Sequence, residues 1–355
     1  MRHPKVYIPC MKFCIPVAVF LVSLFLLGGC SQSSPVKPKV WLYYEWEGLF
    51  THIRLTLEAA DSAQGAFLRD SLDNRFVRYT EEVQTNSALD RQIFAAPVGE
   101  KIALDSDFCE LFRYGLEKYQ STQGRIHVGV GNLLHAYGLI YGMEPHIPRK
   151  DTLEMERQRL RSLFYQMPVH SYSCSLEILQ TGAHYALGSF AKGYAIDLGG
   201  AILDRAGIEN WYLEAGGDLA TRGHNPKGLP WTLGLQNPDE PGGILARLHM
   251  AGSGRDALAT SGGYEHYFTD AEGKRHHHIL DPLTAQSVND KKSVSVFAAR
   301  AIDADFWATY LFVLPFDSAC KRVEAEPGVE AVLISTDDSL FVSSGLKGRF
   351  EMLAK

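Results

Sequence analysis

The segment from residue 187 to residue 197 reads LGSFAKGYAID, and the rest of the chain can be interpreted outward from it. Gly188 and Ser189 stand directly before apolar residues at helical spacing, and Gly207 follows the last of them. This spacing predicts a turn that leads into a helix. The N-terminus of such a helix presents backbone N–H groups and favours anions, and Lys192 adds a positive charge beside it. Taken alone, the segment is better explained as a surface helix with one solvated lysine.

The amino-terminal residues 1–29 are expected to be a lipoprotein signal peptide. Basic residues precede an apolar run from Phe13 to Leu27, which has the length of a signal-peptide core rather than of a membrane span. The run ends in LGGC, which resembles a bacterial lipobox and implies cleavage before Cys30 and lipidation of its sulfur. The serine at position 31, directly after this cysteine, is similar to the residue found there in lipoproteins that are sent to the outer membrane. We therefore expect a lipid-anchored, periplasm-facing protein of the bacterial cell envelope. The alternative is an ordinary secretory signal with an incidental cysteine.

Residues 30–39 are expected to be the lipidated cysteine and a flexible tether, because they are polar, contain prolines and lack an apolar period. Residues 40–355 then form the folded part, long enough for a sizeable core. The whole chain carries a formal charge of −6, and the signal peptide holds three positive and no negative residues, so the mature part carries −6 − 3 = −9. This acidic balance argues against nucleic acid as a partner.

Three cysteines remain beyond Cys30, namely Cys109, Cys174 and Cys320. They cannot all pair with one another, and none has the spacing of metal ligands. Buried thiols, with room for one disulfide, are therefore expected.

Helical patterns dominate the first part of the domain and strand patterns the second. This order predicts an α+β fold with mostly antiparallel strands. The expected helices are 66–79, one with Ser106 as its N-cap, 152–164 and 303–313, with loop and short helix over 127–139. The expected strands are 41–57, 211–214, 231–236, 244–250, 266–269, 278–280, 294–298 and 329–335.

Asp305 and Thr309 lie four residues apart in DADFWAT and therefore share one face of the predicted helix. A carboxylate and a hydroxyl on one face supply oxygen ligands for a hard cation such as Mg²⁺. Taken alone, Asp303 and Asp305 are better explained as acidic residues that complement the helix dipole.

Three consecutive histidines, His276 to His278, precede the sequence ILDP. They suggest a zinc site, but no cysteine or helical histidine pair lies nearby to complete one. A single histidine acting as a general base is chemically reasonable. A solvated strand end is the simplest explanation of the pattern by itself. The segments TSGGY and AGGD are expected to be tight turns that follow strands.

Five motifs follow one another in order: AKGYAID, EAGGDLATRG, ATSGGYEHYF, HHILDPLT and a helix that opens DADFWAT. In this order they resemble the ApbE family, the FAD:protein FMN transferases, over roughly residues 124–313, whereas the amino-terminal part matches poorly. The resemblance implies a two-lobed α+β domain related to the T-fold, with a mostly antiparallel sheet, flanking helices and FAD bound between the lobes. It also implies Mg²⁺-dependent transfer of FMN from FAD to a serine or threonine hydroxyl of a target protein, with release of AMP.

The resemblance also implies roles for individual residues. Asp305 and Thr309 would hold Mg²⁺ together with a main-chain oxygen at Ser189. Lys192 would lie near the FAD phosphates, and His278 would be the base that activates the incoming hydroxyl. The remaining positions would contact the FAD nucleotide, namely Tyr137, Gly138, Leu139, Gly188 and Leu280.

Departures from the family pattern leave two alternatives open. Ala186 replaces an aspartate that contacts the nucleotide in the family, 47–49 read Glu-Gly-Leu in place of Met-Gly-Thr, and 126–127 read Ile-His in place of Phe-Asp. A non-enzymatic FAD-binding lipoprotein and an FAD pyrophosphatase that yields free FMN and AMP are therefore alternatives. The target motif expected from the family is Asp-x-x-Ser/Thr-Gly-Ala-Ser/Thr. This chain has only Thr-Gly-Ala at 181–183, so self-modification is not expected.

Overall fold

The structure is a computed structural model that describes residues 38–140, 142–162, 165–166, 174–240, 242–252, 254–264 and 266–353. The expected signal peptide, Cys30 and most of the tether lie outside the described residues. Lys39–Lys355 form one compact unit. Within the described ranges, every helix is too short or too polar to span a bilayer.

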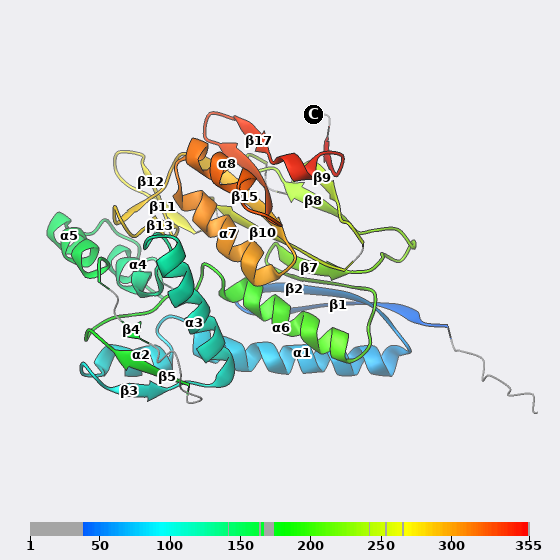
Figure 1. The fold of residues 1–355 in the computed structure, drawn as a ribbon, viewed down its shortest axis with the longest axis horizontal. Coiled ribbons are helices and arrows are strands. Elements are labelled where there is room, and N and C mark those ends of the chain that lie inside the picture. The colour runs from blue at the N-terminus through cyan, green and yellow to red at the C-terminus, as the bar shows by residue number, and fades with distance from the viewer. Residues whose placement is uncertain are drawn as a thin grey trace, which may run out of the picture. The chain divides into compact units, whose positions relative to one another are not determined.

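An eight-stranded sheet forms the centre of this unit, in the order β1-β2-β6-β7-β10-β15-β16-β17 (Figure 1). Every neighbouring pair is antiparallel. The α+β fold with a large antiparallel sheet and flanking helices is therefore confirmed. The strands are β1 (Val40–Gly48), β2 (Thr51–Ala59), β6 (Trp211–Ala215), β7 (Asp218–Arg222), β10 (Arg255–Gly262), β15 (Lys291–Ala298), β16 (Glu330–Ser335) and β17 (Leu340–Val342).

Four helices cover one face of this sheet: α1 (Ser62–Val83), α6 (Ala191–Arg205), α7 (Ala301–Val313) and α8 (Phe316–Glu324). Leu68, Leu72 and Phe76 of α1 recur at a spacing of four and are buried, as an amphipathic helix requires. Helix α7 is apolar on most of its surface and packs against the sheet, α6 and α8. It is consequently a central element of the core.

The opposite face of the sheet is covered by a three-stranded sheet of β8 (Thr232–Gln236), β9 (Ile244–His249) and β18 (Phe350–Met352). Successive residues of a strand point to opposite faces. In β10, Ala257 and Ala259 pack into the large hydrophobic core that includes the helices. Leu258, between them, packs into a smaller hydrophobic cluster with residues of β8 and β9. The central sheet is therefore buried on both faces in this region.

The described residues between 88 and 178 form what we call the helical lobe, on the left in Figure 1. Asp105 caps α3 by accepting the backbone N–H of Phe108 at 2.8 Å. The lobe contains α2 (Ala88–Ala95), α3 (Ser106–Ser121), the short η1 (Val128–Val130), α4 (Gly131–Tyr137) and α5 (Lys150–Arg159), with a small sheet of β3 (Lys101–Ala103), β5 (Ser175–Ile178) and β4 (Tyr165–Gln166).

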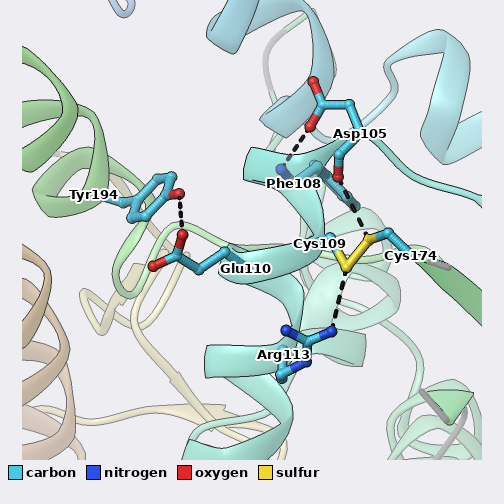
Figure 2. Close-up of a disulfide and its surroundings, with 7 residues drawn as sticks. All are labelled: Asp105, Phe108, Cys109, Glu110, Arg113, Cys174 and Tyr194. Carbon is cyan, nitrogen blue, oxygen red and sulfur yellow. Dashed lines mark hydrogen bonds between the residues drawn. A yellow bond between two sulfur atoms is a disulfide. The ribbon is translucent and has the colours of Figure 1, made fainter. Parts of the chain in front are cut away.

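A disulfide joins Cys109 of α3 to Cys174, which directly precedes β5 (Figure 2). The two Cα atoms are 5.8 Å apart, as expected for a disulfide. Cys320 is a free, partly buried thiol. The sequence left room for one disulfide, and the structure shows that it joins Cys109 to Cys174, which lie 65 residues apart in the chain.

Several sequence-based boundaries are wrong in informative ways. Asp105, not Ser106, caps α3. The TSGGY segment begins inside β10 and not in a turn, because Thr260 and Ser261 pair with β15. His278 lies between two short strands, β12 (Arg275–His277) and β13 (Leu280–Asp281), rather than within one.

The remaining elements are short. Strand β11 (Tyr267–Thr269) pairs with β12, and β14 (Gln286–Ser287) pairs with β13. The 3₁₀ helix η2 is Ser344–Leu346.

Candidate active site

One cavity brings together most of the residues that the sequence analysis singled out. It has a volume of about 780 Å³, including its open mouth, and both the helical lobe and the central sheet contribute to its walls. The sequence-predicted residues that line it are Gly188, Ser189, Lys192, His278, Leu280, Asp305 and Thr309. Apolar side chains form the other part of the lining, among them Ile126, Val130, Leu134, Ile279 and Val313. The cavity therefore combines a polar, charged region with apolar walls.

Helices α6 and α7 position the polar region by capping each other. The carboxylate of Asp197, on α6, accepts the backbone N–H groups of Ala301 and Ile302 at 3.0 and 3.1 Å. Asp305, on α7, accepts the backbone N–H of Gly193 at 2.9 Å. These donors belong to the first turns of the helices, where no intrahelical acceptor exists. The pairing fixes Asp305 beside the N-terminus of α6.

Gly193 is required for this close approach. A Cβ atom at this position would lie 2.2 Å from the carbonyl oxygen of Ala301 and 2.5 Å from its carbonyl carbon. Backbone atoms cannot rotate away, so any side chain here would push the two helices apart. The glycine in AKGYAID is therefore explained by helix packing and not by contact with a ligand.

Asp305 lies in an electrostatic environment that favours a bound cation. It is buried, and Asp218, at the start of β7, lies close by. Burial and the charge of Asp218 raise the pKa of Asp305 to about 8, and Lys192 opposes this shift. The Lys192 Nζ atom lies 3.2 Å from Asp218 Oδ2. A divalent cation would relieve the repulsion between the two carboxylates.

Thr309 follows Asp305 by one helical turn and reaches the same cavity. Its Oγ1 atom lies 3.4 Å from Ser261 Oγ of β10. The polar region therefore offers a set of oxygen atoms, without sulfur or imidazole, from Asp305, Thr309, Ser261 and Ser189. Such a set suits a hard cation such as Mg²⁺.

His278 borders the cavity between β12 and β13. Its backbone N–H donates to His266 O at 3.1 Å, and its Nδ1 lies 3.4 Å from the same oxygen. Burial, together with His266 and His277, lowers the pKa of the imidazole to about 3. The ring is therefore neutral at physiological pH and able to accept a proton.

The other two histidines of the triplet do not share this environment. His276 is buried and pairs with Asp270, with Nε2 and Oδ2 2.8 Å apart, and His277 Nε2 lies 2.7 Å from Val288 O. The explanation of the triplet as a solvated strand end is consequently wrong. Neither side chain lines the cavity, so the three histidines do not form one site.

Sequence reasoning missed two charged residues of the cavity. Asp218 had a signal in the AGGD motif, since it follows the tight turn between β6 and β7. Arg125 comes from the helical lobe, and its Nη1 lies 3.0 Å from Asp281 Oδ2. No local pattern marks Arg125, because its partner lies 156 residues away. It places a second cation in the cavity wall.

Tyr137, Gly138 and Leu139 are not among the residues that line the cavity. They form the C-terminal end of α4, where the Tyr137 hydroxyl donates to Ala285 O at 3.0 Å. Gly138 has φ +66°, and a Cβ there would lie 2.2 Å from Glu144 O. These residues therefore contact other loops of the chain, and the cavity lining does not include the nucleotide contacts expected of them.

The fold resembles solved structures along almost the whole of their chains. One is the ApbE protein from Thermotoga maritima, with a TM-score of 0.77, 23% identity and coverage of 87% of this chain and 99% of that one. Another is the flavin transferase ApbE from Vibrio cholerae, with a TM-score of 0.73, 23% identity and coverage of 88% and 100%. At this identity the likeness establishes the fold.

Sequence comparisons give the family. An FAD:protein FMN transferase from Escherichia coli K12 is 26% identical over 338 residues, covering 92% of this chain and 93% of the relative. A protein of the same name from Vibrio cholerae is 26% identical over 347 residues, with coverage of 93% and 97%. The sequence profile of the ApbE family matches residues 49–333, which include all the cavity-lining residues described above. The chain therefore belongs to the ApbE family.

Proposed function

We propose that this protein is a flavin transferase that moves FMN from FAD to a serine or threonine hydroxyl of a target protein and releases AMP. The observation that carries the proposal is that Asp305, Thr309, Ser189, Lys192 and His278 line one cavity. The names of the curated relatives, which are FAD:protein FMN transferases, support the same reaction.

Asp305 and Thr309, with an oxygen of Ser189, are the residues that would hold Mg²⁺. Oxygen donors with a second carboxylate, Asp218, beside the buried Asp305 suit a divalent cation better than a monovalent one. Such an ion, when bound, neutralises charge that develops on a pyrophosphate during phosphoryl transfer.

The chain's own groups account for the rest of the chemistry. The N-terminus of α6 and Lys192 attract the pyrophosphate of FAD, since both are electropositive. His278 accepts the proton of the attacking hydroxyl, which forms a bond to the FMN phosphorus. The bond from that phosphorus to the oxygen shared with the AMP phosphate breaks, and AMP leaves with the electron pair. The apolar part of the cavity suits the flat isoalloxazine ring.

A non-enzymatic FAD-binding role is the second candidate. Ala186 lines the cavity at the position where the family carries an aspartate that contacts the nucleotide. The loss of that carboxylate changes the contacts available to FAD. A binder of this kind would retain FAD during purification and release no AMP.

The test is incubation of the full chain with FAD, Mg²⁺ and a target domain that carries the Asp-x-x-Ser/Thr-Gly-Ala-Ser/Thr motif. The proposal predicts equal amounts of AMP and of covalently flavinylated target. A matched target with alanine at the acceptor position should stay unmodified. Free FMN with AMP would identify a pyrophosphatase, and FAD retained without AMP would identify a binder. Either result would overturn the proposal.

We also propose that the protein is anchored to the cell envelope through lipid on Cys30, facing the periplasm from the outer membrane. The sequence around Cys30 supports this location. Radiolabelled palmitate should label the wild-type chain but not Cys30→Ala, and the variant should leave the membrane fraction. Labelling of the variant to the same extent would contradict the anchor.

A further inference from the structure

Outside the active site, Asp90, His135 and His184 place one carboxylate oxygen and two imidazole nitrogens within 4.8 Å of one another. They come from α2, α4 and the segment before α6, respectively. Two ligands held about 2 Å from a tetrahedral zinc ion lie about 3.3 Å apart. The three atoms therefore lie near coordination distance of a common point.

The surrounding hydrogen bonds hold the cluster in place. Asp90 is fully buried, and its carboxylate accepts the backbone N–H groups of Asn86 and Tyr185 at 2.9 and 3.0 Å. His184 Nδ1 lies 2.8 Å from Asp90 Oδ2. Asn132 accepts the His184 backbone N–H at 2.7 Å. The bonds to Asn86, Tyr185 and Asn132 orient the two side chains as outer-shell partners orient ligands in metal sites.

Two buried polar atoms at the cluster have no hydrogen-bond partner within the described part of the chain. They are Nε2 of His135 and Oε2 of Glu156 on α5. A buried polar atom without a partner is costly. Burial raises the pKa of Glu156, and the nearby charges of Arg159 and His184 oppose that shift. Glu156 therefore lies near enough to His184 for their charges to interact.

The aromatic contacts define how His184 is held. Its ring stacks on that of His135 with 3.9 Å between centroids and on that of Phe94 with 4.3 Å. Two stacked imidazoles that both carried a proton would repel each other, whereas two neutral imidazoles can bind one metal ion.

We propose that Asp90, His135 and His184 form a second metal site that binds a divalent transition metal ion, with Zn²⁺ as the best match. Two imidazoles and one carboxylate suit zinc rather than magnesium. The site is distinct from the oxygen-lined one at Asp305.

The location assigns the ion a structural role. Leu134, next to His135, and Ala186, two residues after His184, both line the active-site cavity. A metal bound to the cluster ties the helical lobe to the segment that leads into the Gly188–Ser189 turn. It therefore fixes one wall of the cavity from behind.

The test measures Zn²⁺ binding by the full chain after removal of metals with a chelator and return of Mg²⁺ in excess, which occupies the oxygen-lined site. Equilibrium dialysis against Zn²⁺ in this Mg²⁺-containing buffer should give one tightly bound Zn²⁺ ion per chain. Co²⁺ in its place should give the visible absorption of a low-coordinate site. Zn²⁺ should also raise the melting temperature of the wild type.

His135→Asn is the decisive variant. Among the described residues His135 Nε2 makes no hydrogen bond, so the substitution removes a metal ligand without breaking one. It should weaken Zn²⁺ binding at least tenfold and abolish the Zn²⁺-dependent shift in melting temperature. His184→Asn should do the same, and circular dichroism checks that both variants fold. His276→Asn, which removes a buried histidine paired with an aspartate elsewhere, should bind Zn²⁺ as the wild type does. Zn²⁺ binding by the wild type only at millimolar concentration, or equal binding by His135→Asn, would overturn the proposal.

Discussion

Asp305 on α7 accepts the backbone N–H of Gly193 on α6 at 2.9 Å. The carboxylate thus satisfies a donor at the positive end of α6, where negative charge is favourable. Asp197 of α6 makes the reciprocal contact with the first turn of α7. The same arrangement that packs the two helices also holds Asp305 in the cavity. Packing and the proposed cation site therefore depend on each other.

Asp305→Asn tests the charge of this residue with little change in shape. Asparagine can still accept the Gly193 N–H but binds a divalent cation poorly, so we expect AMP release from FAD to fall by about 10² to 10³-fold. The matched control is Asp303→Asn on the same helix. Asp303 accepts the Tyr114 hydroxyl at 2.8 Å and is not among the cavity-lining residues. Equal loss in both variants would show that the effect is structural.

The raised pKa of Asp305 also predicts a pH dependence of stability. The folded-state pKa of about 8 lies above the ordinary value of 3.8, so the folded state binds the extra proton between these values. The free energy of unfolding contributed by this group is therefore highest below about pH 4 and is lost as pH rises through 8. Without divalent cations, Asp305→Asn should melt higher than the wild type at pH 8, and the difference should vanish near pH 4. A lower melting temperature of the variant at pH 8 would contradict the burial of an ionisable carboxylate.

Gly193→Ala tests the close approach of α6 and α7. The added methyl group meets the Ala301 backbone at 2.2 Å, and overpacking of this kind costs about 1–3 kcal/mol. We expect that loss in the free energy of unfolding, measured in urea, and a parallel loss of AMP release. Gly188→Ala is the control for stability, because its Cβ would meet no atom within 4 Å. An unchanged Gly193→Ala variant would refute the packing explanation.

His278→Asn tests the general base. Loss of a well-placed base reduces rate by about 10² to 10⁴-fold, whereas FAD affinity, measured by fluorescence quenching, should change far less. Since the pKa of His278 is lowered to about 3, its protonation should not reduce the wild-type kcat/KM between pH 5 and pH 7. The exposed His249 supplies the control variant His249→Asn. A matching loss of FAD affinity would assign His278 to binding instead.

The disulfide between Cys109 and Cys174 predicts an effect on stability. It links residues 65 apart in sequence, and closing a loop of this length contributes about 4 kcal/mol in the chain-entropy treatment. The double replacement of both cysteines by alanine should lower the free energy of unfolding by up to that amount in oxidising buffer. Cys320→Ala, at a free thiol, should have little effect. Indistinguishable urea unfolding curves for the double variant and the wild type would exclude a stabilising disulfide.

Much of the candidate site could be predicted because its signals are local. The spacing of Asp305 and Thr309 on one helix, and the turn at Gly188 and Ser189 before another, are properties of short segments. Both helices form where the apolar period indicates, at Ala191–Arg205 and Ala301–Val313. Tyr137 to Leu139 do not line the cavity, because whether the end of a helix faces a cavity or another loop depends on tertiary packing.

The sequence by itself determined the types of element, the residues able to bind a cation or accept a proton, and the resemblance to the ApbE family. Only the tertiary structure decided which of these residues meet. Arg125 reaches Asp281 across 156 residues, and Asp90, His135 and His184 gather from three separate segments. Periodicity describes which side of an element is apolar, and the packing of one element on another fixes which polar side chains converge.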